Sequence, residues 1–171
     1  MKRFALSLIR VRGRFAFGTL VVLSLIAVAP GQTALAQQPN QGKYLTEAST
    51  RLSKLIAQAH KDGFILQDNN FSIGGGWIKQ SQDTWVPLFK VTLEAGKKYR
   101  FLAAGDFDAK DVDLDVQDSN GKRVAIDDGT EPEAIVDFTP RVAGEYSVRV
   151  RLYDSDKNLP CLCLAIVLRQ K

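Results

Sequence analysis

Residues 111–117, with the sequence DVDLDVQ, decide the fold class of this chain. The apolar side chains of Val112, Leu114 and Val116 alternate with aspartate or glutamine at each position between them. Successive side chains of a β-strand point to opposite faces of the sheet, so strict alternation is typical of a strand with one buried and one solvated face. The segment therefore predicts a strand with its aspartates on the outer face.

The same alternation recurs along most of the chain. It is present in FKVTL (89–93), KYRFLA (98–103) and EYSVRVRLY (145–153), and the turn sequences EAGK, DSNGK and RVAGE separate the strands. Further strand-like runs are NFSIGGGWIK, KRVAID, EAIVDF and CLCLAIVL. About eight strands with short turns predict an all-β fold, an antiparallel, jelly-roll-like β-sandwich. The run CLCLAIVL is apolar on both faces, which predicts a central position in its sheet.

One amphipathic α-helix is expected before the sandwich, within residues 43–63. Its apolar residues recur at helical spacing, and Gly63 is placed to end the helix as a C-cap. The apolar stripe consists of Leu45, Ala48, Leu52, Leu55, Ile56 and Ala59. Such a stripe either packs on the domain behind it or binds a partner protein.

Residues 1–36 have the pattern of a secretory signal peptide. Basic residues are followed by an apolar run from about residue 15 to 29, and Ala34 and Ala36 occupy the positions expected before a cleavage site. The predicted divisions are a signal peptide at 1–36, a polar lead and helix at 37–63, and the β-sandwich domain at 64–171. We expect an exported protein, periplasmic or extracellular, with no membrane span after cleavage.

The basic net charge of the chain belongs to the predicted signal peptide. That segment holds five lysines or arginines, so 18 of the 23 remain in the mature part against 19 acidic residues. Nucleic acid is therefore not an expected partner.

Two further segments, residues 91–128 (VTLEAGKKYRFLAAGDFDAKDVDLDVQDSNGKRVAIDD) and 136–153 (VDFTPRVAGEYSVRVRLY), carry a family resemblance. Together they resemble the bacterial pre-peptidase C-terminal domain, over roughly residues 77–167. The resemblance implies a small β-sandwich of the kind appended to secreted peptidases, some of which bind calcium. Family members usually follow a catalytic domain. Here the helix takes that place, so the chain is expected to be a standalone copy without a peptidase domain.

The acidic stretch GDFDAKDVDLDVQD (105–118) has two interpretations. Carboxylates on the loop and at the start of the strand could converge on calcium, which prefers six to eight oxygen ligands. Alternatively, arginines on a neighbouring strand, Arg149 and Arg151, balance the aspartates of a solvated strand edge. The candidate calcium ligands are Asp106, Asp108, Asp111 and Asp113.

Nothing in the sequence indicates catalysis. His60 is the single histidine, it lies near the expected helix end, and no nucleophile or metal-protease signature accompanies it. Cys161 and Cys163 lie two residues apart and so on one face of a strand, which favours two buried thiols over a strained disulfide or a zinc site. We expect a protein that is not an enzyme.

The candidate ligand-binding residues are Trp77 and Trp85, which lie near a run of three glycines. They either form an aromatic platform for a sugar or peptide, or cap the core of the sandwich. The sequence thus predicts a secreted, non-catalytic module that binds or stabilises a secreted protein or a polysaccharide, with calcium as the candidate cofactor. The alternatives are a carbohydrate- or peptide-recognition module, and an envelope interaction protein that docks through its helix.

Overall fold

A computed structural model describes residues 41–67 and 71–171, so the predicted signal peptide lies outside the described residues. The elements confirm the predicted fold class, with one helix ahead of nine strands. They are α1 (Gln41–Lys61), β1 (Phe64–Ile65), β2 (Ile73–Ile78), β3 (Val86–Leu93), β4 (Tyr99–Gly105), β5 (Ala109–Gln117), β6 (Arg123–Asp127), β7 (Glu133–Phe138), β8 (Gly144–Ser155), the short 3-10 helix η1 (Asp156–Asn158) and β9 (Cys161–Gln170).

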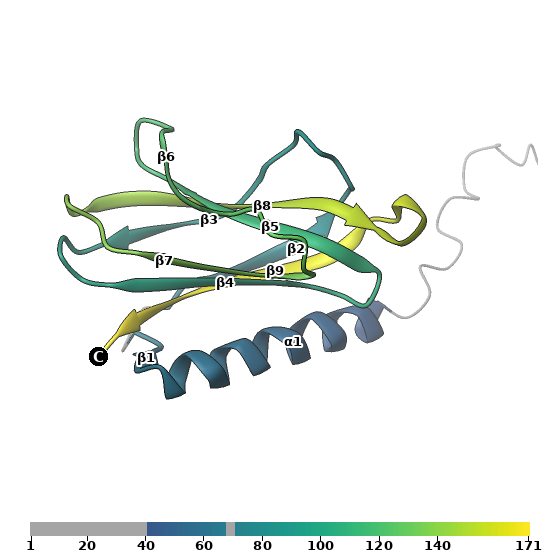
Figure 1. Cartoon of the computed structure of the whole chain (residues 1–171), viewed down its shortest axis with the longest axis horizontal. Coiled ribbons are helices and arrows are strands. Elements are labelled where there is room, and N and C mark those ends of the chain that lie inside the picture. Colours follow the sequence, from purple (N-terminus) through teal and green to yellow (C-terminus); the bar gives the residue numbers. More distant parts are fainter. Residues whose placement is uncertain (1–40, 68–70) are drawn as a thin grey trace, which may run out of the picture. The chain divides into compact units, whose positions relative to one another are not determined.

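The strands form two antiparallel sheets that face each other (Figure 1). In sheet A, the order β2-β9-β4-β7 is extended by β1, which pairs with the end of β9. In sheet B the order is β3-β8-β5-β6. Strands β2 to β9 are thus distributed over two four-stranded layers in jelly-roll order, as the turn spacing predicts. Strand β9 lies between β2 and β4, which confirms the central position expected for CLCLAIVL.

The main core lies between the two sheets and is built by the alternating apolar residues. Val112, Leu114 and Val116 of β5 face it, together with Val148 and Val150 of β8. Sheet A contributes side chains that include Phe101, Ala103, Cys161, Cys163, Ala165 and Val167. The alternation therefore sorts the side chains of sheet B into an apolar inner face and a charged outer face.

Helix α1 covers the outer face of sheet A (Figure 1). Leu52 and Ala59 are buried there against Leu102 and Ile166, and Leu55 and Ile56 pack against the same cluster. Most of the predicted apolar stripe therefore packs against sheet A of the same chain. Its first member, Leu45, is 50% exposed.

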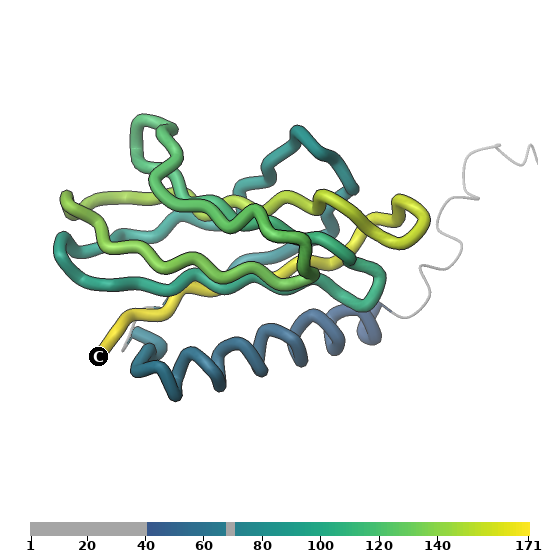
Figure 2. Tube along the Cα trace, in the orientation of Figure 1, coloured from purple at the N-terminus to yellow at the C-terminus, as the bar shows by residue number. Residues whose placement is uncertain are grey.

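The helix ends as the sequence predicts. Gly63 has φ +87°, the left-handed conformation that suits glycine at a helix C-terminus. The main-chain nitrogen of Lys171 donates to the carbonyl of Gly63 at 3.0 Å. The C-terminus therefore lies beside the end of α1, as Figure 2 shows.

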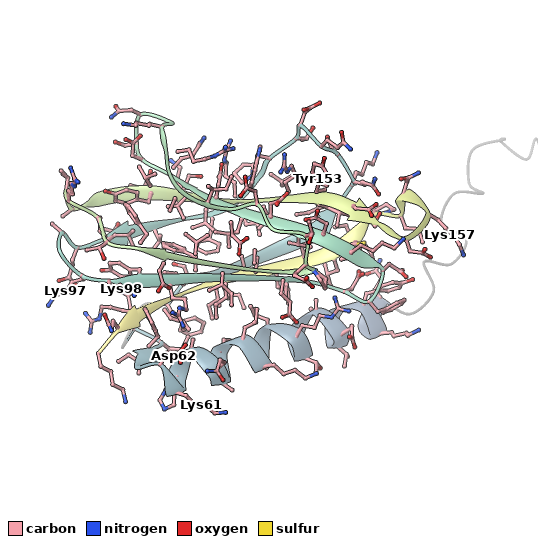
Figure 3. All side chains as sticks on the ribbon, in the orientation of Figure 1. Lys61, Asp62, Lys97, Lys98, Tyr153 and Lys157 are labelled. Carbon is pink, nitrogen blue, oxygen red and sulfur yellow. The ribbon has the colours of Figure 1, made fainter. Side chains whose placement is uncertain are left out.

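A second set of contacts ties the helix end to sheet A. Arg100 of β4 bonds to Asp62 at 2.5 Å and to Asp137 of β7 at 2.6 Å, and its guanidinium lies over the ring of Phe64. The bond from Arg100 lowers the pKa of Asp137 below its usual value. Asp62 and Lys61 are labelled at this end of α1 in Figure 3.

Within the part of the chain that the structure describes, no helix has the length and hydrophobicity of a membrane span.

Candidate functional site

Three aromatic side chains from distant parts of the sequence gather at the surface near the first turn of α1. The rings of Tyr44 and Phe107 stack with centroids 4.8 Å apart, and Trp77 meets Tyr44 edge-on at 5.1 Å. The Nζ of Lys43 lies 4.2 Å from the centroid of the Phe107 ring. Trp77 is 42% exposed, and Phe107 is also exposed. We call Tyr44, Trp77 and Phe107 the Trp77 cluster.

The fold brings these rings together from a helix, a strand and a loop. Trp77 is paired with Leu162 of β9 and points to the side of sheet A that carries α1, since its neighbour Ile78 faces the main core. Tyr44 lies in the first turn of the same helix. Phe107 is on the connection between β4 and β5.

The side chain of Asp106 fixes the loop that carries Phe107. One carboxylate oxygen accepts from the main-chain nitrogen of Asp108 at 3.0 Å, and the other accepts from that of Leu162 at 2.6 Å. Gly105 before it admits no side chain, because an added Cβ would lie 2.3 Å from the Cβ of Ala109. The position of Phe107 is therefore set by the loop backbone.

A cavity of about 350 Å³ adjoins the Trp77 cluster. Tyr44 and Trp77 supply its aromatic wall. Polar groups are supplied by Gln41, Lys79 and Asp108, and apolar edges by Leu159 and Pro160. Burial and the negative charge of Asp106 raise the pKa of Asp108. A site with a large apolar surface and a few polar groups has the general make-up of a small-molecule binding site.

Trp85, the second predicted ligand-binding residue, lies on the opposite outer face, that of sheet B. It is half-buried among three guanidinium groups, those of Arg123 at 4.9 Å, Arg149 at 5.4 Å and Arg151 at 4.7 Å from its ring. The structure therefore does not combine Trp77 and Trp85 in one platform. Nor does either ring belong to the core between the sheets.

Two of the three aspartates of β5, Asp113 and Asp115, are paired with arginines, as one of the two interpretations predicts. The solvated edge that the same interpretation expects is wrong, because all three aspartates are buried. Asp113 accepts from Arg151 Nε at 2.7 Å, and Asp115 accepts from Arg149 Nε and from Arg123 Nε, each at 2.8 Å. A second nitrogen of Arg149 also bonds to Asp115. Both carboxylates are buried beneath these arginines, and burial outweighs the Arg151 bond in raising the pKa of Asp113.

The four candidate calcium ligands do not converge on one point, and they have different partners. Asp106 is bonded to main-chain nitrogens and Asp113 to Arg151, while Asp108 lines the cavity beside Trp77. Among residues 41–67 and 71–171, no three His, Cys, Asp or Glu side chains form a group that could hold a metal ion. Calcium binding by Asp106, Asp108, Asp111 and Asp113 stays a prediction, and it would need these side chains to rearrange.

Asp111 differs from the other aspartates of the strand. Its side chain is buried, yet its Oδ1 has no hydrogen-bond partner among the described residues. Burial, and then the negative charge of Asp113, raise the pKa of Asp111 to about 6. This carboxylate therefore lacks the partner that Asp113 and Asp115 have.

The two cysteines are free and buried on the inner face of β9. Burial raises the pKa of Cys163 to about 12, and it also raises the pKa of Cys161. Thiolates are the reactive form, so these side chains should be inert in the folded protein.

We expect an aromatic disulfide reagent at pH 8 to label neither Cys161 nor Cys163 in the native state, and to label both in denaturant. The measurement is the absorbance of the released thiolate, before and after unfolding. Rapid labelling of the native protein, at a rate independent of unfolding, would contradict the buried placement.

Sequence reasoning missed Tyr44 and Phe107 as members of the site. The available signal was local and weak: each is the single aromatic residue of a short segment that also contains charged residues, GKYLT and GDFDA. Their proximity to Trp77 depends on how the helix and the β4–β5 connection meet at one end of sheet A, which no local pattern encodes.

Comparisons with known proteins add little to this geometry. No family model matches the chain, and no curated protein matches it. Among solved structures, the chain is similar to Aeromonas hydrophila PliG, a periplasmic lysozyme inhibitor of g-type lysozyme. The identity is 10% and the TM-score 0.41, over 60% of this chain and 85% of that chain. At this TM-score we transfer no function, and the resemblance to the pre-peptidase C-terminal domain stays a prediction.

Proposed function

We propose that this protein is an exported, non-catalytic binding module that recognises a carbohydrate through the Trp77 cluster. The observation that carries the proposal is the gathering of Tyr44, Trp77 and Phe107 at the surface beside a cavity of about 350 Å³. Aromatic rings bury large apolar areas when covered, and exposed apolar clusters with polar neighbours mark interaction sites.

The chemistry of the cavity favours a sugar. A pyranose ring offers apolar C–H faces that pack on aromatic rings, and hydroxyl groups that need hydrogen-bond partners. The wall of Tyr44 and Trp77 suits the first, while Gln41, Lys79 and Asp108 supply donors and acceptors for the second. A polysaccharide is therefore the proposed partner, ahead of a peptide.

The number of carboxylates that line the cavity favours carbohydrate binding over carbohydrate hydrolysis. Most glycoside hydrolases use a pair of acidic side chains on either side of the scissile bond. The residues that line this cavity include one, Asp108. His60 lies near the opposite end of α1 from Tyr44. Export rests on the signal-peptide pattern of residues 1–36, and it would place the module where polysaccharides occur.

We expect a Trp77→Ala variant to lose carbohydrate binding by at least about tenfold, since aromatic anchors commonly contribute more than 2 kcal/mol when truncated. The measurement is retention on an array of soluble bacterial and plant oligosaccharides, followed by calorimetry with any oligosaccharide retained. Stability should change little, because Trp77 lies outside the main core.

Trp85→Ala is the matched control, since it removes the same side chain from the opposite face of the sandwich. It should leave the affinity unchanged. The proposal is wrong if both variants bind as the unmodified protein does, or if no oligosaccharide is retained by the unmodified protein.

A further inference from the structure

A second cavity, of about 300 Å³, lies beside β5 and β8 and shares no residue with the site at Trp77. Strand β5 contributes Asp111 and Asp113, strand β8 contributes Arg151 and Tyr153, and the loop after β6 contributes Asp128 and Thr130. Tyr153 is labelled in Figure 3. Three of the six side chains named here are carboxylates.

Asp111 is the unusual member of this cavity. Its exposure is 8%, and its Oδ1 is the one buried side-chain oxygen or nitrogen without a partner in the described part of the chain. The register of β5 against β8 shifts on both sides of it, as at a β-bulge, and bulges re-aim side chains near functional sites. Buried carboxylate oxygens are normally bonded, so this one is an acceptor that no group in the described part of the chain uses.

The positive charge within the cavity is already engaged. Arg151 donates to Asp113 at 2.7 Å and to the carbonyl of Gln82 at 2.5 Å. Meanwhile Asp154 is paired opposite Asp111 across β5 and β8, and Asp127 adds a further negative charge nearby. Like charges across a strand pair are destabilising, so an added cation would relieve repulsion as well as fill the open acceptor.

The kind of cation follows from the number of acceptors. Calcium needs six to eight oxygens, and the described residues bring together no group of three ligating side chains. A primary ammonium group has three donors and needs only a few acceptors. The cavity also has room for an alkyl chain, since one water takes about 30 Å³.

We propose that this cavity binds a primary alkylammonium group, held by the free Oδ1 of Asp111 with Asp128 and Thr130 as further acceptors. The group has two sources, a free amine or a lysine side chain of a protein. The inference does not rest on the carbohydrate proposal, because the two cavities have no lining residue in common.

The test is a titration of ¹⁵N-labelled protein at pH 7.5, followed by amide chemical shifts. The probes are cadaverine as a free diamine and a short lysine-containing peptide, with 1-pentanol as the uncharged control. We expect saturable shifts at Gly129, Thr130 and Tyr153 with at least one amine and none with pentanol. Stronger binding of cadaverine would identify a free amine as the source, and stronger binding of the peptide a protein lysine.

Variants decide whether Asp111 is the acceptor. Asp111→Asn should weaken binding by at least about tenfold, because it removes one member of a buried charge pair. Asp128→Asn, on an exposed loop residue, should weaken it less, and Asp83→Asn in the exposed turn before β3 should have no effect. If Asp111→Asn does not fold, Asp128→Asn provides the comparison.

Three results would overturn the proposal. The first is the absence of saturable shifts with either amine. The second is an amine affinity that Asp128→Asn leaves unchanged, in either of two cases. In one case Asp111→Asn also leaves the affinity unchanged, and in the other Asp111→Asn does not fold. The third is a response of these amides to calcium chloride alone, lost in Asp111→Asn, which would assign the cavity to a metal ion.

Discussion

Replacing Asp115 with alanine is expected to lower the free energy of unfolding by about 3–5 kcal/mol, because it breaks a buried ion pair by removing one partner. Asp115 is fully buried and accepts from Arg149 and Arg123, whose guanidinium groups lie against the ring of Trp85. Without the carboxylate, the half-buried guanidinium of Arg149 would face no opposite charge. Urea unfolding followed by far-ultraviolet circular dichroism measures the change.

Glu145→Ala is the matched control on the same sheet. Glu145 forms an ion pair with Lys90 at 2.7 Å, but both side chains are more than half exposed. Exposed pairs of this kind contribute less than about 1 kcal/mol. Equal destabilisation by the two variants would mean that burial of Asp115 does not set its contribution, contrary to the structure.

Replacing Leu52 with alanine is expected to destabilise the protein by about 2–5 kcal/mol, the usual range for a large-to-small change in a core. Leu52 is 3% exposed between α1 and sheet A, in the cluster that includes Leu102 and Ile166. The structure predicts one cooperative transition in which helix and sandwich unfold together, measured by urea denaturation.

Leu45→Ala tests the same helix stripe at a position that sheet A does not cover. Leu45 is 50% exposed, so its truncation should change stability by less than about 1 kcal/mol. A Leu52→Ala variant as stable as the unmodified protein would show that α1 is not docked. The stripe would then be free for a partner, as the helix-docking hypothesis requires.

The fold could be predicted from the sequence because its signals are local and repeated. Alternation in DVDLDVQ and EYSVRVRLY places Val112 and Val148 in the core and Asp113 and Arg151 outside it. The doubly apolar β9 has core on one side and α1 on the other, as its composition requires. The pairing of aspartate with arginine also follows from pattern, since both lie on outward-facing positions of one sheet.

The candidate sites were harder to predict, because they depend on which distant segments the fold joins. Trp77 and Trp85 are eight residues apart, yet they lie on opposite outer faces, since the chain crosses from sheet A to sheet B between β2 and β3. The acidic residues illustrate the same limit. Spacing alone could not show that Asp106 binds main-chain nitrogens while Asp111 keeps a free oxygen.

The rings of the Trp77 cluster are held in position before any ligand binds, which supports the proposed function. Tyr44 and Phe107 are held by elements that also stabilise the fold, the docked helix and the bonded β4–β5 connection. A ligand would therefore meet rings that are already in place, which reduces the entropy lost on binding. The chain devotes exposed aromatic area to this surface, where a purely structural role would favour burial.

The most direct test of the carbohydrate-binding account is the fluorescence of Trp77 alone. The chain has two tryptophans, so a Trp85→Phe variant leaves Trp77 as the single tryptophan fluorophore. Titration with an oligosaccharide retained on the array should shift its emission to shorter wavelength and saturate at the affinity found by calorimetry. Saturable binding by calorimetry with no change in Trp77 emission would place the ligand elsewhere and contradict the account.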